Sequence, residues 1–229
     1  MPLLWHLNLS RERFKDFDLT LVFLMPRFAL RYMIHRAPDF FDWHSGVFEF
    51  VMDEERLQSE SSRIWMESDY KKYCLLSPQE RQEKTLSIQS LLEEIGIAES
   101  EKARLLFEQG NLFAAGESYE GAIAAYDAAF AIKPDKHEAL NNKGIVLSKL
   151  DRNEEAIAAY DAALAIKPNY ESAIYNKACL YGLQGDTEST LNFLKQAIEL
   201  ESENREIAKT DADFDSIRDN ERFQQLINA

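Results

Sequence analysis

Apolar residues recur at helical spacing just before the middle of the chain. Four of them lie three or four positions apart and so share one face of a helix: Ile88, Leu91, Leu92 and Ile95. The stretch Ser77-Pro78-Gln79-Glu80 precedes this pattern and combines a capping box with proline at the first helical position. Gly96 follows as a stop signal. We therefore predict a helix from Ser77 to Ile95, inside a helical linker that covers residues 53–100.

Residues 1–52 show a different pattern, with apolar stretches of strand length. Three runs are predicted as strands: Trp5–Leu9, Leu19–Met25 and Val47–Val51. The stretches between them, residues 10–17 and 27–36, are predicted as helices. The order strand, helix, strand, helix, strand predicts a small α/β segment with a parallel sheet.

The second half of the chain contains an internal repeat. Residues 122–134 and 156–168 are identical except at Phe130 and Leu164. Residues 139–144 resemble 173–178 at the same offset, and a weaker third copy covers 190–200. Each unit contains two helical patterns, and neither can bury its apolar face alone. Stacking of neighbouring units is therefore expected to build the core.

A period of about 34 residues with two helical patterns per unit resembles the tetratricopeptide repeat family. The resemblance covers about 103–202, as the units 103–136, 137–170 and 171–204. The positions that match are Gly110, Ala122, Tyr126, Ala129 and Pro134 in the first unit and Gly144, Ala156, Tyr160, Ala163 and Pro168 in the second. The third unit departs at Ala178, Thr190 and Ser202. The predicted fold class is mainly α: a helical solenoid of three repeats over 101–204, preceded by the small α/β segment.

The last unit of a solenoid needs a cover for its apolar face. Residues 205–229 carry apolar side chains at helical spacing, namely Phe214, Ile217, Phe223, Leu226 and Ile227. This stretch is similar to the closing segment that often follows bacterial repeat arrays. We predict that it forms C-terminal capping helices.

The resemblance also implies a binding groove, because the first helices of successive units line the concave face in this family. By position, that face presents Arg104, Phe107, Asn111, Asn141, Asn142, Ile145, Lys149, Tyr175, Asn176 and Cys179. Asparagine amides both donate and accept hydrogen bonds, so Asn111, Asn142 and Asn176 are candidates to hold the backbone of an extended peptide. The alternative is that Asn142 and Asn176 only satisfy loop or helix groups of the protein itself.

Some tetratricopeptide domains hold the C-terminal carboxylate of chaperone tails with two asparagines and a set of basic residues. Asn111 and Asn142 stand where those asparagines belong, but Phe107, Ser172 and Asn176 stand where basic residues are needed. A carboxylate would therefore lack its charge-assisted partners. We predict weak binding of such a tail.

The N-terminal segment is similar to part of the bacterial P-loop NTPases that precede such repeats. The similarity rests on residues 7–13, 21–24 and 37–50. The chain contains no Gly-x-x-x-x-Gly-Lys-[Ser/Thr] motif, so ATP hydrolysis by this chain is not expected. The segment is either an interaction module, whose sheet edges pair with another chain or dock on the solenoid, or an inert remnant. We favour the first alternative because exposed Phe40, Phe41, Trp43 and Phe48 would be unfavourable in water.

The net charge restricts the classes of partner, and the cysteine content indicates the compartment. The net charge of −14 and pI of about 4.8 disfavour nucleic acid and anionic membrane surfaces. Two cysteines in unrelated contexts and the lack of a leader pattern indicate a reducing compartment, and we expect the cytoplasm. His35 and His44 flank Asp39 and Asp42, but this spacing matches no zinc pattern.

No set of residues reaches the standard of a catalytic constellation, so we predict no enzyme activity, no cofactor and no metal. The function predicted from the sequence is that of an adaptor or scaffold that binds a partner peptide or protein in the concave groove. The alternative is an accessory or truncated subunit that completes an NTPase-like domain supplied in trans.

Overall fold

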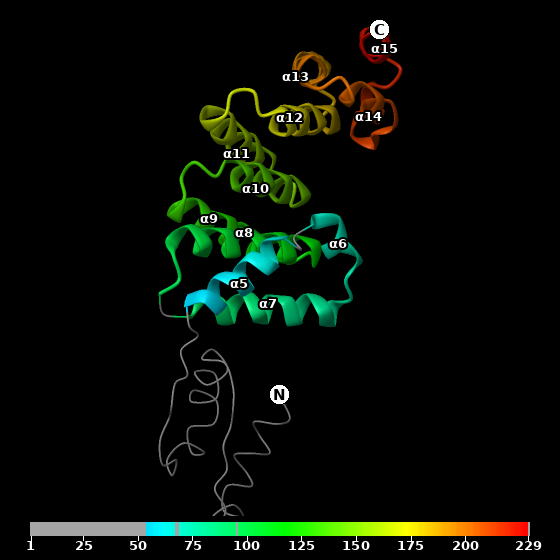
Figure 1. The fold of residues 1–229 in the computed structure, drawn as a ribbon. Helices are drawn as coiled ribbons and strands as arrows, with labels where there is room; N and C mark the ends of the chain where they lie inside the picture. The colour runs from blue at the N-terminus through cyan, green and yellow to red at the C-terminus, as the bar shows by residue number, and fades with distance from the viewer. Residues whose placement is uncertain (1–53, 67–68, 95, 229) are drawn as a thin grey trace, which may run out of the picture.

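The helices of this protein stack into one elongated solenoid (Figure 1). The computed structural model of the 229-residue chain describes residues 54–66, 69–94 and 96–228. Within these residues all regular structure is helical, and no helix is both long and apolar enough to cross a membrane. The α/β segment predicted for residues 1–52, with its candidate edges and its histidines, lies outside the described residues and stays a prediction.

Three antiparallel helix pairs form the middle of the solenoid. They are α8 (Glu99–Ala115) with α9 (Tyr119–Ile132), α10 (His137–Lys149) with α11 (Asn153–Ile166), and α12 (Glu171–Leu183) with α13 (Thr187–Leu200). The second helices of the pairs start at positions 119, 153 and 187, so their spacing equals the period of the sequence repeat. The third pair keeps this register although Ser202 replaces proline, since α11 ends at position 166 and α13 at position 200. The predicted repeat units are therefore confirmed as helix pairs.

Small residues explain how closely the paired helices approach. Ala122 and Ala129 of α9 are fully buried. A Cβ placed on Gly110 of α8 would lie only 2.5 Å from Cε1 of Tyr126, whose ring fills the space between the two helices. Alanine and glycine remove bulk where the helices cross, and tyrosine occupies the gap, as the sequence predicts.

Successive units are joined by polar contacts in addition to apolar packing. Lys143 Nζ lies 2.6 Å from Asp127 Oδ1, and Lys177 Nζ lies 2.5 Å from Asp161 Oδ1. Each lysine belongs to the first helix of one unit and each aspartate to the second helix of the unit before. The same ion pair thus recurs at both junctions between units.

Three further helices cover the N-terminal side of the first pair: α5 (Glu54–Met66), α6 (Tyr70–Leu75) and α7 (Pro78–Leu92). The start predicted for α7 is confirmed, because Ser77 Oγ accepts from the Glu80 amide and Glu80 Oε2 accepts from the Ser77 amide. Ile88 and Leu91 are buried against α8, together with Tyr73 of α6. The linker region is therefore part of the packed solenoid.

The C-terminal side is closed by α14 (Asn204–Thr210), the 3-10 helix η1 (Ala212–Ile217) and α15 (Glu221–Asn228). Helix α15 starts one repeat period after α13, at position 221 against 187, so this cap stands where a fourth unit would be. Phe214 and Phe223 are fully buried in it, against Leu194 of α13. Helices α14, η1 and α15 therefore cover the last repeat unit, which is the role predicted for a cap.

Candidate partner-binding groove

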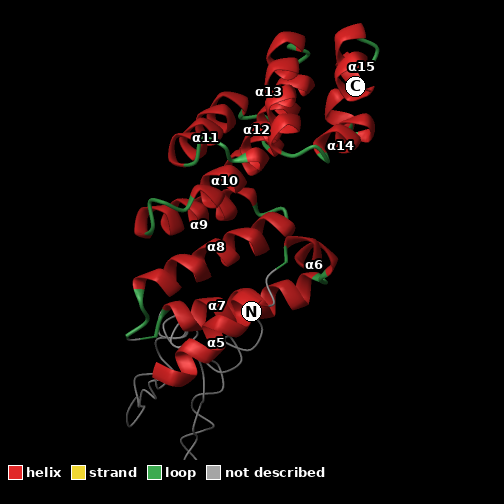
Figure 2. Cartoon of the chain, turned by 45° about the horizontal axis from the view of Figure 1, so that its top comes forward, coloured by secondary structure: helices red, strands yellow, loops and turns green. Residues whose placement is uncertain are grey.

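The first helices of the three pairs, α8, α10 and α12, follow one another along the solenoid (Figure 2). Helices α6 and α14 lie at the two ends of this row, on the same side of the molecule in Figures 1 and 2. Helices α9 and α11 lie toward the opposite side. The surface between α6 and α14 is therefore the face that the repeat pattern predicts to be concave.

Asparagine side chains connect the three first helices in a ladder of hydrogen bonds. Asn176 Nδ2 donates to Asn141 Oδ1 over 2.9 Å, so α12 is joined to α10. Asn141 Nδ2 donates to Asn142 Oδ1 over 3.2 Å. Asn142 Nδ2 in turn donates to Asn111 Oδ1 over 3.1 Å, so α10 is joined to α8. The four amides bind one another across two unit boundaries.

The ladder continues to a buried carboxylate. Asn111 Nδ2 lies 3.3 Å from Glu108 Oε2, and the same oxygen accepts from the Tyr73 hydroxyl over 3.1 Å. Tyr126 donates its hydroxyl proton to Asn111 Oδ1 over 2.9 Å. Glu108 is only 3% exposed, and the hydrogen bonds from Tyr73 and Asn111 compensate its burial. The network therefore runs from α12 to α6.

Glu108 is missing from the residues predicted for the groove, although the sequence contains a signal for it. Positions 108, 142 and 176 follow one another at the period of the repeat and hold the same register in successive first helices. Each of them bonds to a residue two helices earlier in the chain: Glu108 to Tyr73 of α6, Asn142 to Asn111 of α8, and Asn176 to Asn141 of α10. This register position joins neighbouring units.

Burial divides the predicted asparagines into two groups. Asn111 and Asn141 are 7% and 4% exposed, and their hydrogen bonds hold the ladder together. Asn142 and Asn176 are half-buried and reach the surface. All four asparagines thus bond groups of the protein itself, and contact of Asn142 and Asn176 with a partner stays a prediction.

Apolar and basic side chains border the ladder near α8. Phe107 is half-buried, with its ring 5.8 Å from that of Tyr126, and Ile145 is half-buried on α10. Lys136, just before α10, places its Nζ 4.1 Å from the centre of the Phe107 ring. Burial lowers the pKa of Lys136, and Arg104 is one of the cations that add to this lowering. Lys136 is absent from the predicted set, whereas the predicted Arg104 and Lys149 are exposed as expected.

The cap covers the other end of the predicted groove. The Tyr175 hydroxyl donates to Asp211 Oδ2 over 2.9 Å, and Cys179 Sγ lies 3.7 Å from the same oxygen. Gly182 permits this close approach, because a Cβ there would lie 2.6 Å from the carbonyl oxygen of Asp213. Tyr175 and Cys179 thus contact the protein's own capping segment, which the groove pattern alone did not anticipate.

Cys179, Asp211 and Asp213 form, within the described residues, a group of potential metal ligands, with ligand atoms all within 4.8 Å of one another. Burial raises the pKa of the Cys179 thiol, and the two aspartates raise it further. The pKa of Asp213 is also raised, first by burial and then by Asp211. A thiol that stays protonated is a poor metal ligand, so this geometry favours a hydrogen-bonded contact between α12 and η1.

The sequence matches the tetratricopeptide repeat family over residues 101–171 and again over 171–204. Residues 101–204 are tetratricopeptide repeats. The matched residues contain all three helix pairs except the first two residues of α8, and the second match spans one period of the repeat. Among curated proteins, none matches this chain.

Solved structures of other repeat proteins are similar to this one in fold. The structure titled MamA 41-end from Desulfovibrio magneticus RS-1 is 17% identical, covers 78% of this chain and 96% of its own, and has a TM-score of 0.57. Another MamA structure is 16% identical, covers 90% of this chain and 93% of its own, and has a TM-score of 0.50. The TPR2B domain of yeast Sti1, solved in a complex with pHsp70, is 25% identical over 57% of this chain and 94% of its own, with a TM-score of 0.43. The MamA likenesses show that the solenoid fold is shared.

Proposed function

We propose that this tetratricopeptide repeat protein is an adaptor that holds an extended segment of another protein against α8 and α10, between α6 and the C-terminal cap. The observation that supports this proposal is the composition of that surface. Half-buried Phe107 lies one helical turn from Asn111 on α8, and half-buried Ile145 lies one turn from the half-buried amide of Asn142 on α10. Such a surface combines apolar contact with hydrogen bonding to a peptide backbone.

The rigidity of the surface supports the same function. The ladder from Glu108 to Asn176 holds its own side chains in place and joins three helices. These side chains therefore lose little conformational entropy when a segment binds. Tetratricopeptide repeats are in general modules for protein interaction, and we propose no catalytic role. A cytoplasmic location is part of the proposal.

The cap limits the length of the bound segment. Because Tyr175 and Cys179 contact Asp211, the segment has α8, α10 and the start of α12 available to it. An extended chain covers about 3.3 Å per residue, and neighbouring helices are about 10 Å apart, so roughly six to eight residues cross this surface.

A peptide-display selection against the full chain tests the proposal. We expect short peptides to be enriched, and their binding to fall in the variant I145E while it is unchanged in A158E, in which an exposed residue of α11 is replaced. Circular dichroism melting of both variants separates loss of binding from loss of folding. A selection that enriches nothing, or peptides that bind folded I145E as well as wild type, would contradict the proposal.

A further inference from the structure

Lys136 differs from its neighbours Lys133 and Lys143 because it forms no ion pair with the described part of the chain. Lys133 lies 3.9 Å from Asp135, and Lys143 lies 2.6 Å from Asp127. Lys136 instead stands over the face of Phe107, at 4.1 Å from the ring centre to Nζ. In a chain with 40 acidic and 26 basic residues, a half-buried lysine without a carboxylate partner of its own is conspicuous.

The charges around Lys136 do not neutralise it by direct contact. Glu138 and Glu108 attract it, while Lys133 and Arg104 repel it. Glu108 already accepts hydrogen bonds from Tyr73 and Asn111 in the ladder. The ammonium of Lys136 is therefore partly desolvated at the groove surface, beside an aromatic ring and near a second cation.

We infer that the groove is selective for a protein segment carrying an acidic side chain next to an apolar one, with the carboxylate on Lys136 and the apolar group on Phe107. This inference rests on the proposed function and specifies its ligand. A carboxylate at this position gains a charge-assisted hydrogen bond to Lys136. A neighbouring aromatic or aliphatic side chain covers the part of the Phe107 ring that the lysine leaves open.

The net charge of −14 does not oppose this selectivity. At physiological ionic strength the Debye length is about 8 Å, so charges on the outer helices are screened from a ligand seated beside Lys136. Local charges decide which side chain is preferred there. The acidic residue is also internal to the bound segment, so the missing clamp for a terminal carboxylate does not affect it.

The exposed Lys167 offers a matched control. Its Nζ lies 4.9 Å from the centre of the Tyr170 ring, so it is also a lysine on an aromatic ring, but at the end of α11 and not beside Phe107. The charge reversals K136E and K167E therefore change the same residue type in the same kind of contact. The two substituted lysines differ in place: Lys136 lies beside Phe107 at the groove, and Lys167 lies beside Tyr170 at the end of α11.

A random peptide-display library, selected on the full-length wild type, K136E and K167E, tests the inference. We expect wild type and K167E to enrich Asp or Glu beside an apolar residue, and K136E to lose this preference. Selected acidic peptides should bind K136E roughly tenfold more weakly in fluorescence titration, the effect of about one partly desolvated ion pair.

The outcomes separate this inference from the proposed function. Peptides that bind in the groove without acidic enrichment, or whose acidic preference survives in K136E, overturn the inference and leave the adaptor function standing. A wild-type selection that enriches nothing overturns both. Urea unfolding of the two variants is measured alongside, so that a misfolded K136E is recognised and replaced by K136Q, which removes the charge without reversing it.

Discussion

Gly144 lies so close to Tyr160 that a Cβ added to the glycine would be 2.5 Å from Cε1 of the tyrosine ring. Gly110 and Tyr126 have the same relationship in the first unit. In the third unit, Ala178 and Leu194 hold the same two positions, with the same separation along the chain, and both are fully buried. Glycine pairs with the large ring, and alanine pairs with the smaller side chain.

This pairing predicts that G144A destabilises the protein. The Tyr160 ring is only 2% exposed and has no room to move away, so overpacking should cost about 1–3 kcal/mol. The higher helix propensity of alanine offsets up to about 1 kcal/mol of that cost. The free energy of unfolding in urea measures the result. G116A is the control, because the nearest atoms to a Cβ there lie at an ordinary 3.4 Å.

The double variant G144A/Y160L recreates the pair of the third unit. We expect it to be more stable than the sum of the two single effects allows, with a coupling of about 1 kcal/mol or more. Strict additivity of the two substitutions would contradict the explanation of the glycine.

The recurring ion pair should contribute unequally at its two positions. The Lys177 side chain is 7% exposed and that of Lys143 is 25% exposed. D161N leaves a buried ammonium without its counter-charge, which should cost about 1–3 kcal/mol. D127N should cost at most about 1 kcal/mol, because Lys143 is partly hydrated. Equal losses in urea unfolding would show that burial of the lysine does not set the contribution.

The two cysteines should differ in reactivity. Cys74 is exposed, while Cys179 is buried against Asp211 and its pKa is raised. We expect one thiol per chain to react with a disulfide reagent in the native protein and two in denaturant. Substitution C74S should abolish the native reaction. A fast reaction of Cys179 in the native C74S variant would mean that the cap does not seal α12.

The raised pKa of the Cys179 thiol predicts how the stability of the protein changes with pH. Because the folded thiol has a higher pKa than the unfolded one, its contribution to stability is complete below the unfolded pKa and is lost as the pH rises above it. We expect C179A to reduce the fall in stability between about pH 8 and pH 10, relative to wild type. A steeper fall of the free energy of unfolding in C179A than in wild type would contradict this prediction.

The asparagine ladder should contribute to stability through its buried members. N141A removes the oxygen that accepts from Asn176 and the amide nitrogen that donates to Asn142. Asn141 is only 4% exposed, so water does not replace these bonds easily. We expect a loss of about 1–3 kcal/mol in urea unfolding. The control N192A removes an exposed asparagine that bonds to Gln196 within α13, and it should have little effect. If N141A leaves the free energy of unfolding unchanged, the ladder does not stabilise the contact between units.

The repeats could be predicted from the sequence because each physical requirement leaves a signal at a fixed spacing. Gly110 and Tyr126 recur as Gly144 and Tyr160, so period, helix pairing and close packing are all visible in the residue types. The start of α7 was equally clear, since a capping box is a local signal that depends on a few neighbouring positions. Phe214 and Phe223 marked the cap through their helical spacing.

The candidate site was harder to predict, because position on a helix does not show what fills the space opposite. The sequence placed Tyr175 and Cys179 on the concave face, but not Asp211, which reaches them from the cap. The sequence left open whether asparagines of this face serve a partner or the protein itself, and it did not show that Asn111 and Asn141 are buried. Such contacts depend on how separate units meet, which the spacing within one unit does not determine.

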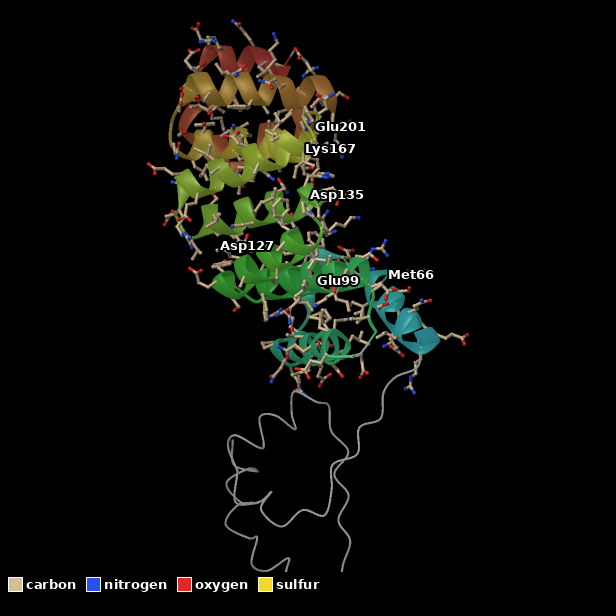
Figure 3. The ribbon with its side chains drawn as sticks, turned by 90° about the vertical axis from the view of Figure 1, so that its left-hand side faces the viewer. Met66, Glu99, Asp127, Asp135, Lys167 and Glu201 are labelled. Carbon is tan, nitrogen blue, oxygen red and sulfur yellow. The ribbon has the colours of Figure 1, made fainter. Side chains whose placement is uncertain are left out.

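The central claim is that the partner segment lies on the face formed by α8 and α10, and site-specific photo-crosslinking tests it most directly. Figure 3 shows the side chains along the solenoid, with Asp127 of α9 among those labelled. Lys149 at the end of α10 and Ala158 on α11 are both exposed. A benzoylphenylalanine is placed at one of these positions in the full chain, and a display-selected peptide is added. We expect crosslinks from position 149 and none from position 158. Crosslinks from position 158 with none from position 149 would contradict the account.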